Sequence, residues 1–499
     1  MTNVLYDALF APHARNPRPF LQCDDGTTIT YAEFVERAAQ IAHVLRASGV
    51  EVGDRIVVQA PKTADTVALY AASVQAGAIY LPLNTAYTLA ELEYFITDAT
   101  PSLVVCDAEQ KAEIAPIATR TGAKVLTLNT SGTGSLSQTA DDQETTFETV
   151  ARGPEDLAAL LYTSGTTGRS KGAMMSHKNL LSNAQSLTDL WRISDQDRLL
   201  HALPIFHTHG LFVALNTSLL AGATVRLMGA FDIDVMLGEM PDATLLMGVP
   251  TFYTRLLGDR RLTKDAVQNM RLFISGSAPL LAETHQAFEA KTGHLILERY
   301  GMTETNMITS NPYDGARVPG TVGYPLPGTE VKVTYPETGE TVPHGEIGMI
   351  EVRGANVFQG YWNMPEKTAE ELRSNGFFLT GDLATQDPDG RITIVGRAKD
   401  LIISGGYNIY PKEIEDVLND VPGVLESAVF GVPHSDFGES TIAAIVAEDG
   451  AALDIEELRE KAEAKLARFK HPRQYIVMAA LPRNTMGKVQ KNVLRAQYV

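Results

Sequence analysis

Residues 162–172 read Tyr162-Thr163-Ser164-Gly165-Thr166-Thr167-Gly168-Arg169-Ser170-Lys171-Gly172, and eight of these eleven residues are Gly, Ser or Thr. The apolar run 158–162 is typical of a buried strand, and residues 173–175 can continue as a second strand. The stretch is therefore predicted to be a loop at a strand end, where α/β proteins place ligands. Glycines let the backbone approach a ligand closely, and the hydroxyls, the backbone N–H groups and Lys171 can together wrap a polyphosphate.

The stretch differs from the Walker A loop, G-x-x-x-x-G-K-[ST]. Counting from Gly165, the second glycine position holds Ser170, and Gly172 rather than Ser or Thr follows Lys171. No hydroxyl residue is thus available after the lysine to hold a metal as in that loop. A flexible surface loop is the ordinary alternative for such a run, and these residues alone leave it open.

Length and composition limit the class of protein. A chain of 499 residues with 44% hydrophobic and 20% charged residues indicates a globular protein of two or more domains. The net charge of −18 argues against nucleic acid as a partner, because its phosphates need a basic face. The two cysteines, Cys23 and Cys106, give no disulfide framework. No secretory signal is evident and no apolar run reaches the roughly 20 residues of a membrane span, so we expect a cytoplasmic protein without a membrane partner.

Helical and strand patterns alternate in the first part of the chain. Strands are expected at 55–59 and 78–83 and a helix at 64–76, which indicates a doubly wound, parallel sheet. The polar segment 129–146 is expected to be a surface excursion. Residues 315–396 are rich in Gly and Pro and alternate in polarity, which predicts a small antiparallel subdomain. The predicted fold class is α/β: a large N-terminal domain of doubly wound sheets plus a small β-rich subdomain, and a small mobile α+β C-terminal domain.

Three histidines, His201, His207 and His209, lie close together in the sequence, so a metal site has to be weighed. On a strand, His207 and His209 would share one face. No cysteine lies near them, and the closest carboxylate, Asp197, belongs to a charged turn upstream. A structural histidine with satisfied hydrogen bonds is therefore preferred to a metal ligand.

Residues 162–172 resemble the phosphate loop of the adenylate-forming superfamily, which comprises acyl-CoA synthetases, luciferases and the adenylation domains of peptide synthetases. Further motifs of that superfamily follow in the family's order and cover nearly the whole chain. The resemblance implies ATP, Mg²⁺ and CoA as cofactor and co-substrates, with Glu304 as the Mg²⁺ ligand. It implies catalysis by Thr163, Lys171, Glu304 and Lys488. The implied ATP-binding residues are Thr163, Ser164, Gly165, Thr166, Thr167, Gly168, Lys171, Ser277, Ala278, Pro279, Glu298, Tyr300, Gly301, Thr303, Asp382, Arg397 and Lys488.

The same resemblance assigns roles within this set. Tyr300 matches the ring that stacks on adenine, and Thr303 matches a hydroxyl aimed at the α-phosphate. Asp382 matches the residue that accepts hydrogen bonds from the ribose hydroxyls, and Arg397 should reach the ribose or the phosphates. Lys488 resembles the lysine that bridges the carboxylate being activated and the α-phosphate, a task that suits a point charge on a flexible stem.

The segment 396–411 is the second strong family match. In the family it contains the hinge, here Lys399 and Asp400, and a loop behind the CoA channel, here Ser404, Gly405 and Gly406. The resemblance implies an N-terminal adenylation domain, 1–398, whose acid and ATP site is completed by the subdomain at about 315–396. It implies a C-terminal lid, 399–499, that turns between the two half-reactions.

Arg299 departs from the general superfamily pattern, in which a small or neutral residue usually precedes the tyrosine. Such a position faces the acyl pocket, and a guanidinium there can hold a carboxylate in bidentate fashion. Together with Ser277–Pro279, this arginine most resembles the malonyl-CoA synthetases. The resemblance implies that Arg299, His207 and Ser277 hold the distal carboxylate of malonate. A structurally paired or exposed arginine is the alternative.

The implied reaction converts malonate, CoA and ATP to malonyl-CoA, AMP and pyrophosphate through a malonyl-adenylate. One alternative is a synthetase for methylmalonate, a longer dicarboxylate or a plain short acid. A second is an adenylating enzyme that passes the acyl group to a carrier protein or to oxygen. A third is a non-enzymatic nucleotide-binding regulator, which the intact Lys488, Glu304 and Asp382 argue against.

Overall fold

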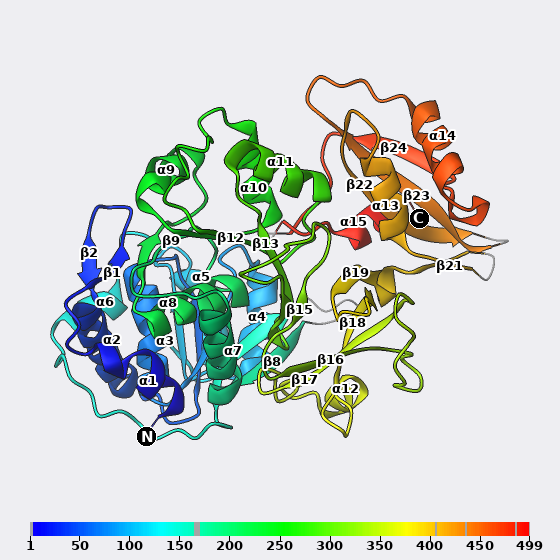
Figure 1. Cartoon of the computed structure of the whole chain (residues 1–499). Helices are drawn as coiled ribbons and strands as arrows, with labels where there is room; N and C mark the ends of the chain where they lie inside the picture. The colour runs from blue at the N-terminus through cyan, green and yellow to red at the C-terminus, as the bar shows by residue number, and fades with distance from the viewer. Residues whose placement is uncertain (1–2, 164–169, 405–406, 435–436, 485–486, 499) are drawn as a thin grey trace. The chain divides into compact units, whose positions relative to one another are not determined.

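The computed structural model describes residues 3–163, 170–404, 407–434, 437–484 and 487–498 (Figure 1). The chain divides into two compact units. The first comprises residues 1–330 and 352–378, and the second comprises residues 331–351 and 379–499. The functional division at residues 398 and 399 stays a prediction.

A six-stranded sheet in the first unit has the order β6-β5-β3-β4-β7-β8. Its strands are β3 (Arg55–Gln59), β4 (Ile79–Pro82), β5 (Leu103–Cys106), β6 (Lys124–Thr127), β7 (Leu157–Thr163) and β8 (Lys171–Ser176). All neighbours are parallel except β7 and β8, which form an antiparallel pair around the phosphate-loop stretch. The predicted strands at 55–59 and 78–83 are therefore confirmed.

A nine-stranded sheet in the same unit has the order β15-β14-β13-β12-β11-β9-β10-β1-β2. Its strands are β1 (Pro19–Gln22), β2 (Thr28–Thr30), β9 (Arg198–His201), β10 (Thr224–Leu227), β11 (Leu245–Gly248), β12 (Leu272–Ser275), β13 (Leu297–Met302), β14 (Asn306–Ser310) and β15 (Tyr324–Pro325). The six inner strands are parallel, whereas β2, β14 and β15 run antiparallel to their neighbours. The inner strands thus end at a common edge, as a doubly wound sheet requires.

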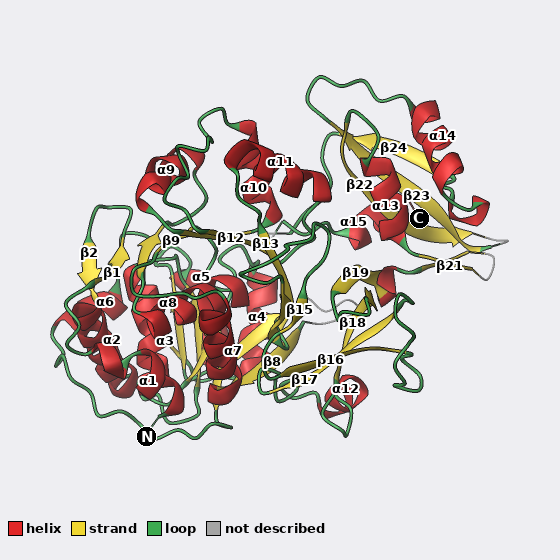
Figure 2. Cartoon of the chain, viewed as in Figure 1, coloured by secondary structure: helices red, strands yellow, loops and turns green. Residues whose placement is uncertain are grey.

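Helices pack on one another beside these sheets (Figure 2). They are α1 (Val4–Leu9), α2 (Tyr31–Ala47), α3 (Ala64–Gln75), α4 (Leu89–Ala99), α5 (Lys111–Arg120), α6 (Ser135–Asp141), α7 (His177–Leu190), α8 (Asn216–Ala221), α9 (Ile233–Glu239), α10 (Pro250–Gly258), α11 (Ala282–Thr292) and α12 (Pro365–Glu371). Ser176 caps α7 by accepting from the backbone of Asn179, whose side chain accepts in return from the Ser176 backbone. Helix α6 lies within 129–146, so that segment is not a mere surface excursion, because it buries Leu136 and Ala140.

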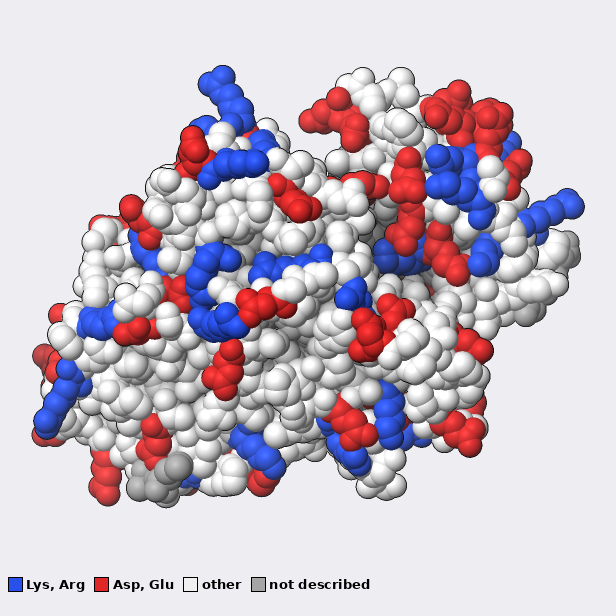
Figure 3. Space-filling model, in the orientation of Figure 1, with Lys and Arg blue, Asp and Glu red and all other residues white. Residues whose placement is uncertain are grey.

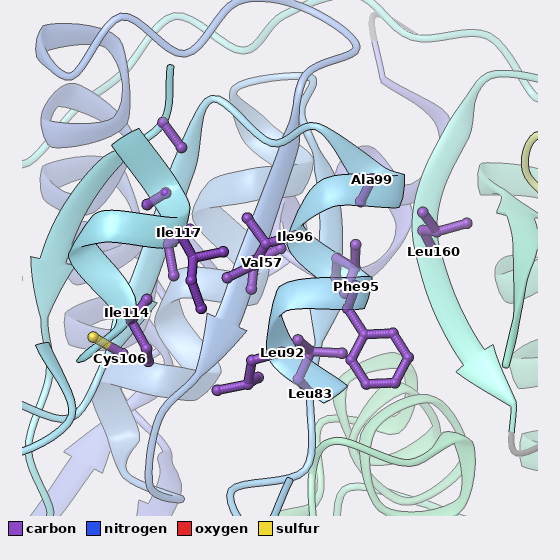
Figure 4. Packing of buried hydrophobic residues seen from close by; sticks show 14 of the residues in the cluster. Val57, Leu83, Leu92, Phe95, Ile96, Ala99, Cys106, Ile114, Ile117 and Leu160 are labelled. Atoms are coloured by element: carbon purple, nitrogen blue, oxygen red, sulfur yellow. The ribbon is translucent and has the colours of Figure 1, made fainter. Parts of the chain in front are cut away.

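Figure 4 shows the apolar core between the six-stranded sheet and helices α4 and α5. Val57 and Val104 come from adjacent strands, and Phe95, Ile96 and Ile117 come from the helices. Each such side chain stabilises the fold by about 1.5–3 kcal/mol when it leaves water. Within the described residues, none of the helices combines the length and the apolarity needed to cross a bilayer.

Two further sheets follow in the chain. A four-stranded sheet has the order β16-β17-β18-β19, with strands β16 (Thr329–Thr334), β17 (Gly348–Gly354), β18 (Phe378–Gln386) and β19 (Ile392–Arg397). The other sheet has the order β21-β20-β23-β22, and β24 pairs with β23. Its elements are β20 (Ile402–Ser404), β21 (Tyr407–Ile409), β22 (Val424–His434), β23 (Gly438–Ala447) and β24 (Gln474–Met478), with helices α13 (Pro411–Asn419), α14 (Ile455–Lys465) and α15 (Lys491–Tyr498). The predicted α/β class, with a β-rich part and an α+β C-terminal part, is confirmed.

Candidate active site

The two ends of the predicted phosphate-loop stretch are Thr163, the last residue of β7, and Lys171, the first residue of β8, and these two residues pair. The predicted phosphate-binding residues 164–168 lie outside the described residues. The Lys171 ammonium lies 3.1 Å from each carboxylate oxygen of Glu371. It also lies 4.1 Å from the centroid of the Tyr361 ring. Lys171 therefore has one anionic and one aromatic partner in the first unit.

Tyr361 connects this ion pair with the predicted magnesium ligand. Its hydroxyl lies 2.6 Å from Oε2 of Glu371 and 3.0 Å from Oε1 of Glu304. A phenol has one O–H proton, so the two carboxylates compete for it. Although burial acts to raise it, hydrogen bonds from Tyr361, Lys367 and Lys171 hold the pKa of Glu371 below its ordinary value. Glu371 is thus an anion that Lys171 can exchange for a phosphate.

The hairpin of β13 and β14 carries most of the predicted adenine- and metal-binding residues. Tyr300 and Gly301 lie on β13, and Thr303 and the buried Glu304 lie in the turn that follows. A Cβ atom added to Gly301 would lie 2.1 Å from the carbonyl oxygen of Asn306. Only glycine therefore allows the two strands to approach this closely.

The predicted residues next to this hairpin are less enclosed. Ser277 and Ala278 follow β12 and are half-buried, and Pro279 is exposed. Glu298 is buried on β13, where its Oε1 accepts a hydrogen bond of 3.3 Å from the backbone N–H of Leu280. Glu298 therefore ties the 277–280 turn to β13 in the first unit.

Arg299 is only 3% exposed and lies on β13. Its Nε and Nη2 have no hydrogen-bond partner in the described part of the chain. A Cβ atom on Gly276 would lie 2.5 Å from Cζ of Arg299, so that glycine makes the room for the guanidinium. Burial lowers the pKa of Arg299 to about 9, and the nearby Tyr253 opposes this shift. Because no carboxylate of the described residues compensates it, this guanidinium is a ready partner for an anion.

His209, weighed from the sequence only as a metal ligand, lies beside the predicted acid-binding residues. It is fully buried, and its Nδ1 lies 3.2 Å from Oγ of Ser277. Its Nε2 has no partner among the residues that the structure describes. Burial and the charge of Arg299 lower the pKa of His209 well below its ordinary value, so the ring is neutral. Ser277 holds a left-handed backbone with φ 71°, an unusual conformation for a non-glycine residue that is common at binding sites.

The expectation that His207 and His209 share the face of a strand is wrong. His207 lies in an irregular segment and is half-buried, whereas His209 begins a π-helix, His209–Leu215. His207 accepts a long hydrogen bond of 3.4 Å at Nδ1 from the backbone N–H of His209. The reason is local: Pro204 and Gly210 fold the segment back on itself, since a Cβ on Gly210 would lie 2.1 Å from the Pro204 carbonyl oxygen.

The predicted ribose ligands lie in the second unit. Asp382 on β18 pairs with Arg397 on β19, and Nε of Arg397 lies 2.8 Å from Oδ1 of Asp382. Asp382 is buried, and its backbone N–H donates to Oγ1 of Thr380 at 3.1 Å. Arg397 and the Thr380 turn therefore fix the position of the Asp382 carboxylate in this unit.

Lys488 lies in the same unit as these two residues. Burial, the charge of Arg397 and that of Lys399 lower the pKa of Lys488 to about 8, against the opposing effect of Asp382. The ammonium is therefore a strongly desolvated charge that gains from an anionic ligand.

The predicted hinge and CoA residues follow. Lys399 and Asp400 form a short helical turn, and Oδ1 of Asp400 accepts from Nη2 of Arg495 at 3.1 Å. Ser404 ends β20 opposite Tyr407. Gly405 and Gly406 lie outside the described residues, so the proposed CoA loop is seen here only at its two ends.

Residues 11–362 match the AMP-binding enzyme family, and residues 413–488 match the AMP-binding enzyme C-terminal domain. The chain belongs to this family. The match covers the β7–β8 hairpin, Arg299 and Glu304 in the first region and Lys488 in the second. The superfamily resemblance inferred from the motifs is thereby confirmed.

Individual relatives agree with this assignment. The crystal structure of ATP-bound MatB from Rhodopseudomonas palustris has a TM-score of 0.98 and 56% sequence identity, with 99% of each chain covered. A feruloyl-CoA synthase of Amycolatopsis is 36% identical over 98% of this chain and 97% of its own. A mitochondrial malonate–CoA ligase of Mus musculus is 36% identical over 94% of this chain and 86% of its own. Family membership alone therefore does not identify the carboxylic acid that the enzyme activates.

Proposed function

We propose that this protein is an acid–thiol ligase that converts malonate, CoA and ATP to malonyl-CoA, AMP and pyrophosphate through a malonyl-adenylate. The observation that carries this proposal is the buried guanidinium of Arg299, which has no counter-ion among the described residues. Removing such a charge from water is costly unless an anion arrives with the substrate. A plain aromatic or alkyl acid has only the carboxylate that reacts, whereas malonate brings a second one. The malonate–CoA ligases among the relatives support the same acid.

The distal carboxylate is held by Arg299 together with Ser277 and a histidine. Nε and Nη2 of the guanidinium are the two donors still available, and a pair of parallel N–H groups suits a carboxylate. His207 stays the histidine that the resemblance implies, and His209 is a second candidate because it contacts Ser277 and lies within the electrostatic reach of Arg299. If Ser277 donates its hydroxyl proton to Nδ1 of His209, the imidazole presents Nε2–H as a further donor.

We propose the following roles in the first half-reaction. Lys171 leaves Glu371 for the β- and γ-phosphates, and Thr163 with the loop residues 164–168 lines the same group. Glu304 fits the role of magnesium ligand because it is a buried carboxylate oriented by the Tyr361 hydroxyl. Mg²⁺, when bound, neutralises phosphate charge and so favours attack on the α-phosphate. Lys488 bridges the attacking carboxylate and the α-phosphate, where negative charge develops in the transition state.

The remaining ATP contacts follow the family motifs. Tyr300 stacks on adenine, with Ala278, Pro279, Glu298 and Gly301 around the base, and Thr303 points to the α-phosphate. Asp382 and Arg397 hold the ribose. A bare carboxylate is a poor acyl donor, and its conversion to a mixed anhydride with AMP makes it reactive toward the CoA thiol.

The second half-reaction needs a different arrangement around the acyl-adenylate. We propose that the lid, 399–499, turns about Lys399 and Asp400, as is typical of the family. This withdraws Lys488 and brings the Ser404–Gly406 loop to the CoA thiol. One adenylate site then serves two steps without releasing the intermediate.

The partners are small molecules, namely malonate, ATP and CoA. The face drawn in Figure 3 intersperses acidic and basic side chains, and the net charge is −18, which does not favour nucleic acid. We also propose a cytoplasmic location, which the two free cysteines support, although the mouse relative carries the word mitochondrial in its name.

The test is pyrophosphate release with ATP, Mg²⁺ and CoA across acetate, malonate, methylmalonate, succinate and oxalate. We expect malonate well ahead of acetate, with malonyl-CoA as a product that requires CoA. Acetate or succinate in front would refute the assignment of the acid while leaving the adenylation chemistry intact. Release of pyrophosphate without a CoA ester would point to another acyl acceptor.

A further inference from the structure

Lys62 carries an enclosed ammonium group that the proposed mechanism does not use. The residue lies between β3 and α3. Its Nζ lies 2.9 Å from Nδ1 of His201, 2.8 Å from the His201 carbonyl oxygen and 2.8 Å from the Leu203 carbonyl oxygen. An ammonium has three N–H donors, so these three acceptors satisfy it completely. No carboxylate is among them.

This arrangement determines the state of His201. Nε2 of His201 lies 2.8 Å from the carbonyl oxygen of Gly210, which can only accept, so the ring proton lies on Nε2. Nδ1 of the neutral ring therefore accepts from Nζ of Lys62. Burial and the charge of Lys62 lower the pKa of His201 well below its ordinary value, which keeps the ring neutral and this pattern fixed.

The two hydrogen bonds of His201 close the segment 201–210 into a loop with Lys62 at its base. Gly210 packs against the Pro204 carbonyl, and the backbone N–H of Leu211 donates to the carbonyl oxygen of His207 at 3.0 Å. The same loop contains His207 and His209, and the His209 ring contacts Ser277. The position of His209 beside Arg299 thus depends on how this loop is held.

Lys62 also joins two sheets. It follows the carboxyl end of β3 in the six-stranded sheet, and His201 is the last residue of β9 in the nine-stranded sheet. Ligands of doubly wound folds lie outside such carboxyl ends. A contact that fixes these two strand ends relative to each other is therefore well placed to fix a binding site.

We infer that Lys62 is a positioning residue for acid recognition: it holds the 201–210 loop through His201 and thereby sets His209 beside Arg299. This inference rests on the proposed role of Arg299 and His209 in binding the distal carboxylate. Lys62 itself touches no substrate. Its removal should therefore weaken the use of malonate and leave ATP binding, which depends on other segments, nearly unchanged.

The test compares three variants with the wild type in steady-state pyrophosphate release. Lys62→Met removes all three hydrogen bonds. His201→Asn keeps an acceptor near the Nδ1 position and removes the donor to Gly210. Lys291→Met is the matched control, because the Lys291 ammonium also binds two backbone carbonyls, those of Leu257 and Asp259 at 2.7 and 2.8 Å, away from this loop.

We expect Lys62→Met and His201→Asn each to raise the KM for malonate by about ten- to a hundredfold, as for a displacement of about 1 Å at a binding group. The KM for ATP should change less than about twofold, because the groups that contact ATP stay in place. Lys291→Met should leave both constants at their wild-type values, even if its melting temperature falls.

Equal changes in the two KM values, or a lower melting temperature with an unchanged KM for malonate, would show that Lys62 is merely structural. An effect of Lys62→Met without one of His201→Asn would refute the connection through His201. If Lys62→Met does not fold, His201→Asn decides the question alone. Should the wild type prefer another acid, the proposed function fails, and the KM for that preferred acid then tests the positioning role of Lys62 separately.

Discussion

Replacing Arg299 by methionine should make the protein more stable and, at the same time, a poor malonate ligase. Methionine keeps much of the side-chain length and removes the charge. In the ligand-free protein the guanidinium is buried and has no compensating anion among the described residues. The substitution therefore removes an unfavourable buried charge from the folded state, and it also removes the group that binds the distal carboxylate of the substrate.

The magnitude follows from the pKa of Arg299, which burial lowers from the ordinary arginine value to about 9. At 1.36 kcal/mol for each pKa unit, this shift corresponds to a penalty on the order of 5 kcal/mol in the folded state. The penalty is fully present below about pH 9, where both folded and unfolded states carry the proton, and it disappears as the pH approaches the ordinary pKa of an arginine. At pH 7 we therefore expect Arg299→Met to gain roughly 2–5 kcal/mol.

The activity should change in the opposite direction. Losing one partner of a buried charge pair costs about 2–5 kcal/mol, so kcat/KM for malonate should fall on the order of 10²- to 10³-fold. Acetate has no distal carboxylate, so its kcat/KM should change by less than about threefold. The assays are pyrophosphate release with both acids, and urea unfolding at pH 7 with and without malonate.

Arg271 provides the matched control. Its guanidinium binds the buried Asp197 with Nη2 to Oδ2 at 2.6 Å and Nε to Oδ1 at 2.8 Å. Arg271→Met leaves that carboxylate buried without its cation, so it should destabilise the protein by about 3–5 kcal/mol. If Arg299→Met is less stable than the wild type, or keeps the wild-type activity with malonate, Arg299 is not an uncompensated charge that binds the distal carboxylate.

Three further predictions concern neighbouring groups. Gly276→Ala should lower kcat/KM for malonate by about 5- to 100-fold, because the new Cβ would lie 2.5 Å from Cζ of Arg299 and overpacking costs about 1–3 kcal/mol. Gly258→Ala is the control, since a Cβ at that position has nothing within 4 Å. Equal activities of the two variants would contradict the prediction. Pyrophosphate release should decline for acetate and malonate alike as the pH rises through about 8, where Lys488 loses its proton. Lys488→Arg should remove that decline. A pH profile that this substitution leaves unchanged would assign the titration to another group. Glu371→Gln should lower the KM for ATP about two- to fivefold, because a half-buried ion pair worth about 1 kcal/mol no longer competes with ATP for Lys171. A raised KM for ATP would mean that Glu371 positions Lys171 instead.

Much of the fold is predictable because it is encoded by local patterns. Apolar runs gave β3 and β4 within one residue. Helix α6 escaped because its Ser- and Thr-rich composition resembles a loop, and only tertiary packing makes Leu136 part of the core. Local propensity is a weak guide where burial decides.

The site residues divide in the same way. Motifs locate Lys171, Glu304 and Lys488, because their chemistry is written into a short stretch of sequence. Their partners are distant along the chain: Glu371 lies 200 residues after Lys171, and His201 lies 139 residues after Lys62. No spacing rule reveals such contacts, so neither the ion pair of Lys171 with Glu371 nor the contact of Lys62 with His201 could be expected from the sequence.

The contrast between Arg271 and Arg299 shows why residue type alone does not identify a ligand. Both are arginines near strands of the same sheet, and the sequence leaves each of them free to be paired or unpaired. Asp197 lies within hydrogen-bonding distance of Arg271 and compensates its charge, so this arginine stabilises the fold. Arg299 is more deeply buried, and two of its donors have no partner among the described residues, at a cost that the folded protein carries until an anion binds. On the proposed function, selectivity for a second carboxylate follows from this unmet charge, because an acid that cannot supply the anion leaves the cost in place throughout the reaction.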